Sequence, residues 1–325
     1  MPVNGEHFPL LKYLDKLVET LRTLSPRAVG GKDADAVHDA RVASRRLKAA
    51  VNLLGPVASR EYRQPLAKIH RSVRKRLGPL RDLDVMLEHL SKIKSPRFEE
   101  PVQWLSERLN EDRRQVLEKA ADDLPPAYVA GKLGSWWGLR EEIADCGDAV
   151  TTLLAESVHL QLDCVAEQAG HLVERTEHHE PHQLRIACKE LRYTLEMAEQ
   201  NGAKLPKGML ASFKRLQTAL GNWHDFVVLT GRAIKESTDA DLAVRAPELQ
   251  QAMLKLAMML MARSQKQLSK VIEFWLKDGE ELVRSIRAAF PLTAAVSEPA
   301  AMEELKPREG IVHEEHEGAR SEQVQ

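Results

Sequence analysis

The chain has 325 residues and a hydrophobic content of 43%, enough for about two domains and a sizeable apolar core. Its formal net charge is only −1, but residues 37–81 carry twelve Lys and Arg against two acidic residues, whereas residues 294–325 carry eight Glu against three basic residues. The balanced total therefore does not exclude a polyanionic partner, because a net charge of +10 within 45 residues attracts anions when it gathers on one face.

Cysteine usage and hydropathy indicate the compartment. Cys146, Cys164 and Cys188 form no paired or C-x-x-C pattern, so we expect no disulfide framework and a reducing environment. The N-terminus lacks a basic start followed by an apolar run, so we expect no signal peptide. The most apolar stretch, residues 252–262, is too short to span a bilayer and contains Lys255. The sequence predicts a cytoplasmic protein without a membrane segment.

Helical periodicity dominates the chain, and we find no run of alternating β-branched residues that predicts a strand. Asp33 or Asp35 is expected to cap the second helix, Pro181 to lie in a first turn, and Gly78 and Gly221 to end helices. The sequence thus predicts an all-α fold, with helices over residues 6–24, 35–54, 60–77, 79–94, 98–123, 148–174, 181–200, 207–220, 222–237, 247–277 and 279–289.

Two motifs occur twice at nearly the same separation. "HDARVASRRLK" begins at His38 and "HQLRIACKELR" at His182, while "LGPLRDLDV" surrounds Gly78 and "LGNWHDFVV" surrounds Gly221. We interpret the chain as two copies of one helical unit, offset by about 144 residues. The predicted division is a first bundle over residues 1–124, a Pro/Gly-rich linker over 125–147, a second bundle over 148–291, and a disordered acidic tail over 292–325.

Each copy carries stripes of cations without acidic partners. On a helical wheel of residues 37–54, one histidine and three cations fall within about 80° of one another, opposite the apolar face. The stripes of the first copy are His38, Arg41, Arg45 and Lys48, then Lys68, Arg71 and Lys75; those of the second are His182, Arg185, Lys189 and Arg192, then Lys207 and Lys214.

These stripes have two readings. A solvated helix face normally mixes charges, because like charges four residues apart repel each other by a few tenths of a kcal/mol. Stripes of one sign on successive helices make physical sense when an anion lies between them, and the planar guanidinium of Arg grips phosphate oxygens through two bonds. We therefore favour polyanion binding over a merely solvated surface.

Asp82 and Asp225 occupy equivalent places in the two copies, each after a glycine. One reading is a favourable interaction with a helix dipole, and the other is an ion pair that fixes an arginine of the stripe. His38 and His182, near their helix starts, are either hydrogen-bonded structural residues or additional anion ligands.

The repeated motifs "HDARVASRRLK" and "LGPLRDLDV" resemble those of the conserved histidine α-helical domain (CHAD) family, over roughly residues 6–290. The resemblance implies two related antiparallel helical bundles packed around a shared basic surface or cavity. It also implies binding of inorganic polyphosphate, in some members at polyphosphate granules. It assigns a binding role to His38, Arg41, Arg45, Arg46, Lys48, Arg71, Lys75, Arg81, His182, Arg185, Lys189, Arg192 and Lys214, which the stripes extend to Lys68 and Lys207.

The second copy departs from this pattern in three places. Glu190 stands where the first copy has Arg46, Gln217 replaces an arginine, and His224 stands where the first copy has Arg81. We therefore expect the second copy to bind polyphosphate more weakly, or to hold only one end of the chain.

Two rival functions remain open. A metal-dependent phosphohydrolase would draw on the ligand-rich segments at His178, His179, Glu180 and His182 and at His313, but neither has a helical i,i+4 His pair with a Glu between, and no carboxylate cluster recurs in the repeat. A nucleic-acid-binding protein would use the same cations, but the stripes lack the aromatic platforms of single-strand binders. We predict non-catalytic polyphosphate binding with no cofactor and no metal; chain-length preference, oligomeric state and the stripes that face each other are not predicted.

Overall fold

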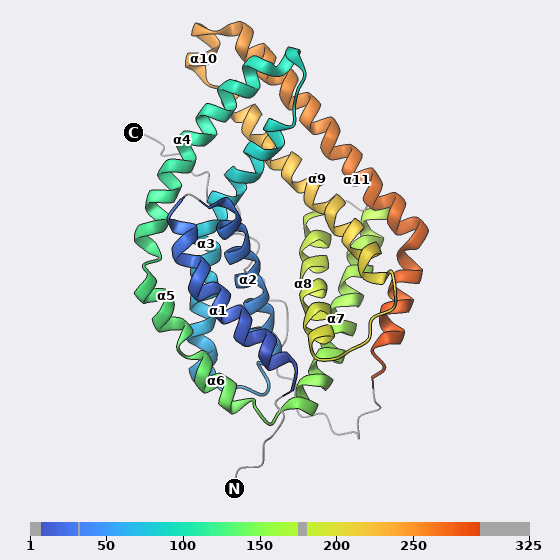
Figure 1. The fold of residues 1–325 in the computed structure, drawn as a ribbon. Coiled ribbons are helices and arrows are strands. Elements are labelled where there is room, and N and C mark those ends of the chain that lie inside the picture. The colour runs from blue at the N-terminus through green and yellow to red at the C-terminus, as the bar shows by residue number, and fades with distance from the viewer. Residues whose placement is uncertain (1–7, 32, 175–180, 293–325) are drawn as a thin grey trace, which may run out of the picture. The chain divides into compact units, whose positions relative to one another are not determined.

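The computed structural model describes residues 8–31, 33–174 and 181–292, and every regular element within them is helical, which confirms the all-α fold (Figure 1). The chain up to Pro291 forms one compact unit. The predicted disordered tail lies, apart from Leu292, outside the described residues. The helices are α1 (Leu10–Val29), α2 (Ala34–Leu53), α3 (Arg60–Ser91), the 3₁₀ helix η1 (Pro96–Phe98), α4 (Glu99–Asp123), α5 (Pro126–Leu133), α6 (Trp136–Glu142), α7 (Gly147–Glu174), α8 (Pro181–Gln200), α9 (Met209–Ser237), α10 (Ala240–Arg245) and α11 (Pro247–Ala289).

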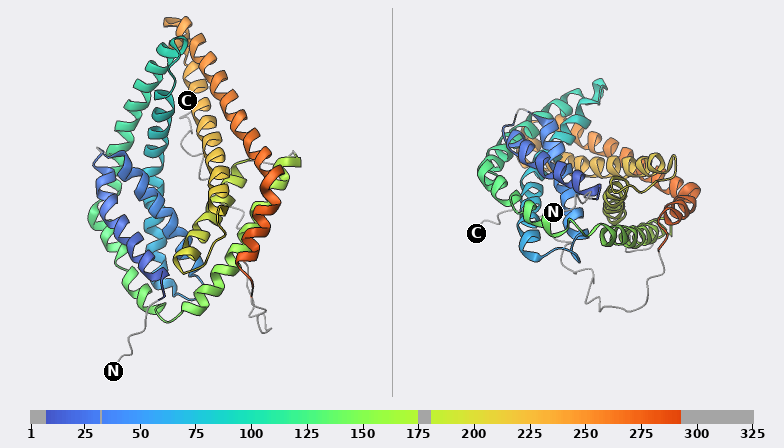
Figure 2. Two further views of the ribbon diagram at one scale, coloured as in Figure 1. Left: turned by 45° about the vertical axis from the view of Figure 1, so that its right-hand side comes forward. Right: turned by 60° about the horizontal axis from the view of Figure 1, so that its bottom comes forward.

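Helices α1–α6 lie on one side of the unit and α7–α11 on the other, and α2 and α8 meet between them (Figures 1 and 2). One apolar core joins both sides and includes Leu14, Leu47 and Leu191. A second core joins the far ends of α3 and α4 to α9 and α11, with Leu83 and Leu256 among its members. Apolar burial on both sides of the central pair therefore fixes where α2 and α8 stand.

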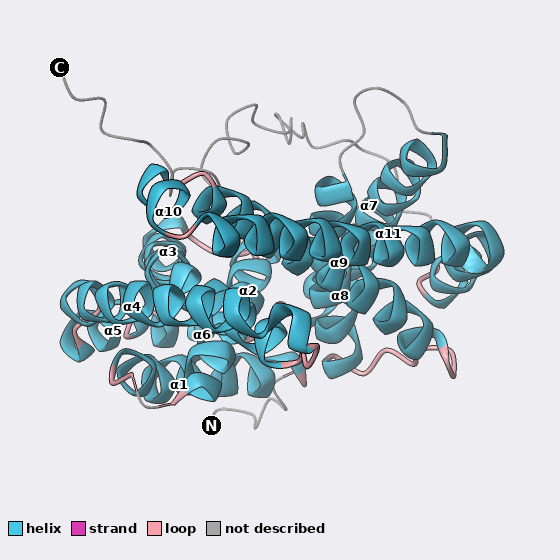
Figure 3. Cartoon of the chain, turned by 90° about the horizontal axis from the view of Figure 1, so that it is seen from above, coloured by secondary structure: helices cyan, strands magenta, loops and turns pink. Residues whose placement is uncertain are grey.

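The predicted linker, residues 125–147, contains α5 and α6, which pack against helices of the first half. Seen from above, all layers of the unit are helical, and α1, α4, α5 and α6 cover the outside of the first half (Figure 3). Both apolar cores contain residues from before and after this segment. The boundaries 1–124, 125–147 and 148–291 stay a prediction.

Three predicted helix ends are wrong. Helices α3, α9 and α11 run without a break through Gly78, Gly221 and Gly279, where we expected two helices each. A glycine within a helix costs only about 1 kcal/mol, which the burial of a long apolar face exceeds. At Gly279 a Cβ would lie 2.8 Å from the Trp275 ring, so there the glycine permits close packing rather than ending a helix.

Two predicted helix starts are confirmed. The Asp33 side chain caps α2, since its Oδ1 accepts a hydrogen bond from the Ala36 N–H at 2.9 Å. Helix α8 begins at Pro181, whose fixed φ suits a first helical position. In the part of the chain that the structure describes, no helix combines the length and apolar character needed to cross a bilayer.

Gly78 and Gly221 differ in what surrounds them, which gives a stability prediction. A Cβ at Gly78 would lie 3.0 Å from Arg41 Nη1, whereas nothing lies within 4 Å of a Cβ at Gly221. We expect Gly221→Ala to raise the free energy of unfolding by about 0.5–1 kcal/mol, as in an open helix interior. Gly78→Ala should gain clearly less, because Arg41 must shift. Urea unfolding followed by circular dichroism measures both, and equal gains would contradict a close contact at Gly78.

Candidate anion-binding site

Arg41 is the most deeply buried cation of the predicted stripes, with 9% of its surface exposed. The apolar residues of α2, among them Leu47, pack into the core and turn the opposite face of the helix toward α3 and α8. Arg41 Nη1 donates a hydrogen bond to the Leu77 carbonyl oxygen at 3.1 Å, across the space that Gly78 leaves open. Its Nη2 lies 3.8 Å from Asp82 Oδ1. Arg41 is therefore fixed in place and presents a positive charge from beneath the surface.

Other arginines surround Arg41. Burial and the neighbouring Arg45 lower the pKa of the Arg41 guanidinium to about 10. Arg81 of α3 and Arg185 of α8 act in the same direction, and Asp82 opposes them. Burial is the main cause of the low guanidinium pKa, and the like charges that add to it come from both halves of the chain.

Asp82 explains one of the open readings of the sequence. It lies inside α3 rather than at a helix start, so interaction with a helix terminus does not account for it. It pairs with Arg41 instead, as the ion-pair reading expected. The surrounding protein raises the pKa of its carboxyl, while Arg41 and Arg45 lower it. Its counterpart Asp225 pairs with His89 of α3, Oδ2 to Nε2 at 3.6 Å.

The first half adds further cations beside Arg41. Within the described residues, Arg45 and Arg81 donate no hydrogen bond and form no ion pair closer than 4 Å. Burial lowers the pKa of His38, and Arg81 lowers it further. His70 is 7% exposed, and burial followed by the charge of Lys48 lowers its pKa to about 4. For both His38 and His70, burial and the neighbouring cations disfavour the protonated form.

The second half contributes a smaller cluster. The rings of His182 and His224 lie 5.4 Å apart between centroids. Burial and then Arg185 lower the pKa of His224 to about 3, and Lys189 acts in the same direction. His182, Arg185 and Lys189 are half-buried on α8, and Arg185 also influences Arg41 and Asp82 of the first half. The predicted residues of α8 therefore lie near those of α2.

Three predicted binding residues are engaged elsewhere. Lys48 Nζ lies 2.7 Å from Glu190 Oε1, and Arg46 Nε donates to Glu196 Oε2 at 2.8 Å. Arg192 Nε donates to the other oxygen of Glu196 at 2.6 Å. These ion pairs connect α2 with α8. Arg46, Lys48 and Arg192 thus have acidic partners in this structure, and their role as anion ligands stays a prediction; the sequence did not indicate the partner Glu196.

The remaining predicted residues lie on exposed surface. Arg71 of the second stripe and Lys48 of the first stripe both lower the pKa of His70. The two stripes therefore lie near the same histidine. The side-chain amino groups of the other members form no hydrogen bond or ion pair within the described part of the chain; these are Lys68 and Lys75 of α3, Lys207 before α9, and Lys214 on α9. Sequence analysis missed His70, although its position on α3 beside the stripe could have suggested it.

The family of the chain follows from comparison. The sequence matches the family model of the CHAD domain over residues 12–234. The chain belongs to the CHAD domain family. The fold resembles the crystal structure of the CHAD domain from the plant Ricinus communis, with 20% identity, a TM-score of 0.60, and coverage of 85% of this chain and 94% of that one. PptA from Streptomyces chartreusis gives a TM-score of 0.48 with 14% identity, covering 81% of this chain and 99% of that one. No curated protein matched the sequence.

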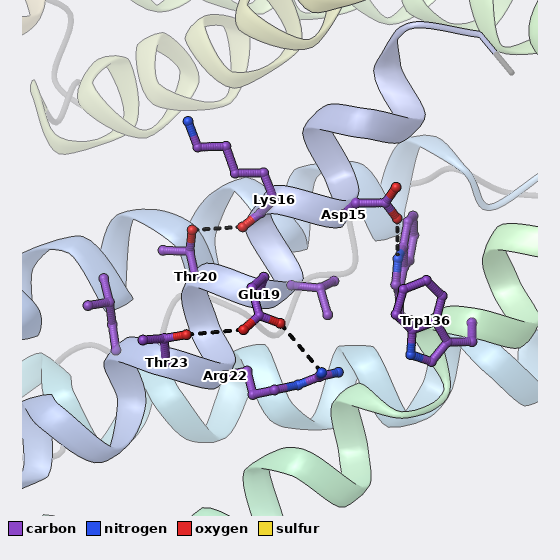
Figure 4. A pocket seen from close by; sticks show the side chains of 10 residues that line it. Asp15, Lys16, Glu19, Thr20, Arg22, Thr23 and Trp136 are labelled. Carbon is purple, nitrogen blue, oxygen red and sulfur yellow. Dashed lines mark hydrogen bonds and ion pairs between the residues drawn. The ribbon is translucent and has the colours of Figure 1, made fainter. Parts of the chain in front are cut away.

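A groove on this CHAD domain lies away from the predicted binding residues. It has a volume of about 620 Å³ and lies between α1 and α6 (Figure 4). Asp15 accepts a hydrogen bond there from Trp136 Nε1 at 2.8 Å, and Glu19 pairs with Arg22. Its mainly apolar wall and its satisfied charges do not suit a phosphate chain.

Most of the predicted ligands of the rival metal site lie in segments that the structure does not describe. His178, His179, Glu180 and His313 lie outside the described residues. Within residues 8–31, 33–174 and 181–292, no group of three His, Cys, Asp or Glu side chains has the arrangement to hold a metal ion. Those described residues therefore add no support to the predicted alternative of a metal-dependent phosphohydrolase.

The buried His70 gives a prediction for the pH dependence of stability. Its pKa is about 4 in the folded protein and about 6.5 when unfolded, so between these values the unfolded chain binds more protons. Stability is therefore lost as the pH falls, and we expect His70 to account for about 2 kcal/mol between pH 7 and pH 5. His70→Gln should remove that part of the loss. Urea unfolding of both proteins at the two pH values measures it, and identical pH dependence would contradict the prediction.

Proposed function

We propose that this CHAD domain binds inorganic polyphosphate, without turning it over, through cations of α2, α3 and α8. One observation carries the proposal: Arg45, Arg81 and Arg185 all lower the pKa of the buried Arg41, although they come from three different helices. Guanidinium groups held this close repel one another and cost folding free energy. A bound polyanion offsets that cost, and Arg offers phosphate a two-pronged hydrogen bond.

Asp82 places an accessible carboxylate among these cations. Its side chain keeps 60% of its surface accessible and lies 3.8 Å from Arg41 Nη2. The surrounding protein is the main cause of its raised pKa, while Arg41, Arg45 and Arg185 all lower that pKa. The three arginines thus act on one carboxylate that water reaches, so a flexible chain of phosphates could approach their charges as well.

Polyphosphate fits these cations better than nucleic acid does. Bases need aromatic or hydrogen-bonding partners, whereas phosphates need only cations. Trp223 is the indole nearest the predicted residues, and it is half-buried, with its ring 6.2 Å from that of His224. Within the described residues, no aromatic ring is stacked by Arg45 or Arg81 in a cation–π contact that would signal a base platform.

The proposal contains no catalytic step. Asp82 and Asp225, the carboxylates at equivalent places in the two copies, are each paired with a basic side chain, Arg41 and His89 respectively. A carboxylate held by a cation is a poor general base for activating water. We also propose a cytoplasmic location, with recruitment to polyphosphate granules as a consequence of binding; the three cysteines, all unpaired, agree with a reducing compartment.

Arg45 and Arg81 are the side chains to test first. We expect Arg45→Ala and Arg81→Ala each to weaken binding of long polyphosphate by about 10-fold or more, as for a lost charge-assisted hydrogen bond. Each should also reduce the slope of log affinity against log salt by about one. Lys270→Ala on α11 is the matched control, since Lys270 is an exposed cation on a helix without predicted ligands. Isothermal titration at several salt concentrations measures both quantities.

Two results would end this proposal. Affinity that does not change with salt would point to a ligand other than a polyanion. Equal losses in Lys270→Ala and Arg45→Ala would show attraction to overall charge rather than to a site. Single-stranded DNA of matched charge, added as competitor, should displace polyphosphate poorly, and efficient displacement would favour the nucleic-acid function.

Turnover is tested separately. We expect no release of phosphate when the protein is incubated with polyphosphate and Mg²⁺ or Mn²⁺, because the described residues offer cations to hold phosphate but no group of side chains arranged to hold a metal ion that activates water. Release above a protein-free control, lost in a His178→Ala, His179→Ala variant, would replace the proposal with a metal-dependent hydrolase.

A further inference from the structure

Helices α2 and α8 differ in charge where the predicted repeat would make them alike. At the offset of 144 residues, Glu190 takes the place of Arg46, and Glu196 takes the place of Asn52. Both changes place an acid beside the cationic stripe of α8. Judged from the sequence alone, they weaken polyphosphate binding by the second copy.

The structure gives both glutamates partners across the interface between the halves. Glu190 accepts from Lys48, and the two oxygens of Glu196 accept from Arg46 and from Arg192 of its own helix. The side chains of the two pairs that cross from α2 to α8 are between 21% and 33% exposed. We call this group of five side chains the clasp.

The clasp is also anchored to α9. Arg192 Nη1 donates to Gln217 Oε1 at 3.4 Å, and Gln217 Nε2 donates to the Cys188 carbonyl oxygen at 2.7 Å. Gln217 is another position at which the second copy departs from the first, which has Arg74 there. Glu190, Glu196 and Gln217 therefore all form contacts at or beside the interface between α2 and α8.

The clasp occupies only one part of each helix. On α2 it starts at Arg46, whereas the residues around the buried Arg41 precede it. On α8 it starts at Glu190, whereas Arg185 precedes it. The repulsion that Arg185 exerts on Arg41 pushes the two helices apart beside the clasp. Oppositely charged pairs a turn or more away pull them together.

We propose that Glu190 and Glu196 are positioning residues, which hold the cationic parts of α2 and α8 at a separation that one polyphosphate chain can span. This inference rests on the proposed function. A chain that touches both helices gains affinity because its second contact is intramolecular, by about 10²- to 10⁴-fold when the geometry permits. Ion pairs that water still reaches add little to the free energy of unfolding. We therefore assign the clasp a role in setting the separation of α2 and α8 rather than in stabilising the fold.

A charge-reversal variant distinguishes the effect of the helix separation on affinity from the effect of the net charge. Glu190→Lys faces Lys48 with a like charge and makes the protein more positive by two units, so electrostatics alone would strengthen polyphosphate binding. We expect the opposite for long chains: a loss of about 10-fold or more, as joint contact with both helices is lost. Tripolyphosphate, too short to need both helices, should bind Glu190→Lys as well as or better than wild type. The double variant Lys48→Glu, Glu190→Lys restores both the pair and the net charge, and should regain the wild-type ratio of long-chain to short-chain affinity.

The separation of α2 and α8 is also measured in the absence of polyphosphate. Spin labels at Asp39→Cys on α2 and Glu199→Cys on α8, both exposed positions, report the separation once Cys146 and Cys164 are replaced by serine. We expect a longer or broader distance distribution in Glu190→Lys and a wild-type distribution in the double variant. Helical circular dichroism of every variant confirms that the protein compared is folded.

The outcomes separate this inference from the proposed function. If the wild-type protein does not bind polyphosphate, the proposed function fails, while the label distances still decide whether the clasp sets the separation. If Glu190→Lys binds long chains more tightly, or leaves the label distance unchanged, the clasp inference is overturned even though polyphosphate binds. Failure of the double variant to recover the affinity ratio would overturn it as well.

Discussion

The burial of the Arg41 guanidinium between α2 and α3 is the constraint on which the arrangement of the site depends. A buried charge needs partners, and Arg41 finds them in the Leu77 carbonyl oxygen and in Asp82. These contacts require a close approach of the two helices, which the missing side chain of Gly78 permits. Once Arg41 is fixed, Arg45 follows one turn later on the same face of α2. The site is therefore positioned by a buried cation rather than by its exposed ones.

Repulsion among these cations has to be offset elsewhere in the fold. Both apolar cores join the two halves of the chain, so hydrophobic burial brings α2 and α8 together in spite of their charge. The ion pairs of Glu190 and Glu196 then offset part of the remaining repulsion locally. The protein thus carries two kinds of cation on the same helices: those that acids neutralise, such as Lys48, and those that remain in an uncompensated field, such as Arg45.

Much of this was predictable from the sequence, and the limits have identifiable physical causes. Apolar residues at helical spacing predict helices whatever their neighbours, so the all-α fold and the cationic face of α2 emerge from the pattern. The continuity of α3 through Gly78 does not, because a local breaker competes with tertiary packing that the sequence does not display. The engagement of Lys48 is likewise invisible, since its partner Glu190 lies 142 residues away and looks like a lost ligand until both are placed in space.

The departures of the second copy gain a physical explanation if the repeat is a duplication. When two identical units meet about a two-fold axis, the same patch faces itself, so identical cations confront each other. Such an interface becomes complementary while its halves stay identical only when each copy carries acids as well as cations, so both copies give up cations at the positions that the acids take. Covalent linkage of two copies removes that restriction. One copy can then keep Arg46 and Lys48 while the other acquires Glu196 and Glu190, and the repulsive pair becomes attractive without any loss of the cations that precede it. On this argument, asymmetry at the clasp allows one copy to keep all its cations while the two cationic faces stand side by side.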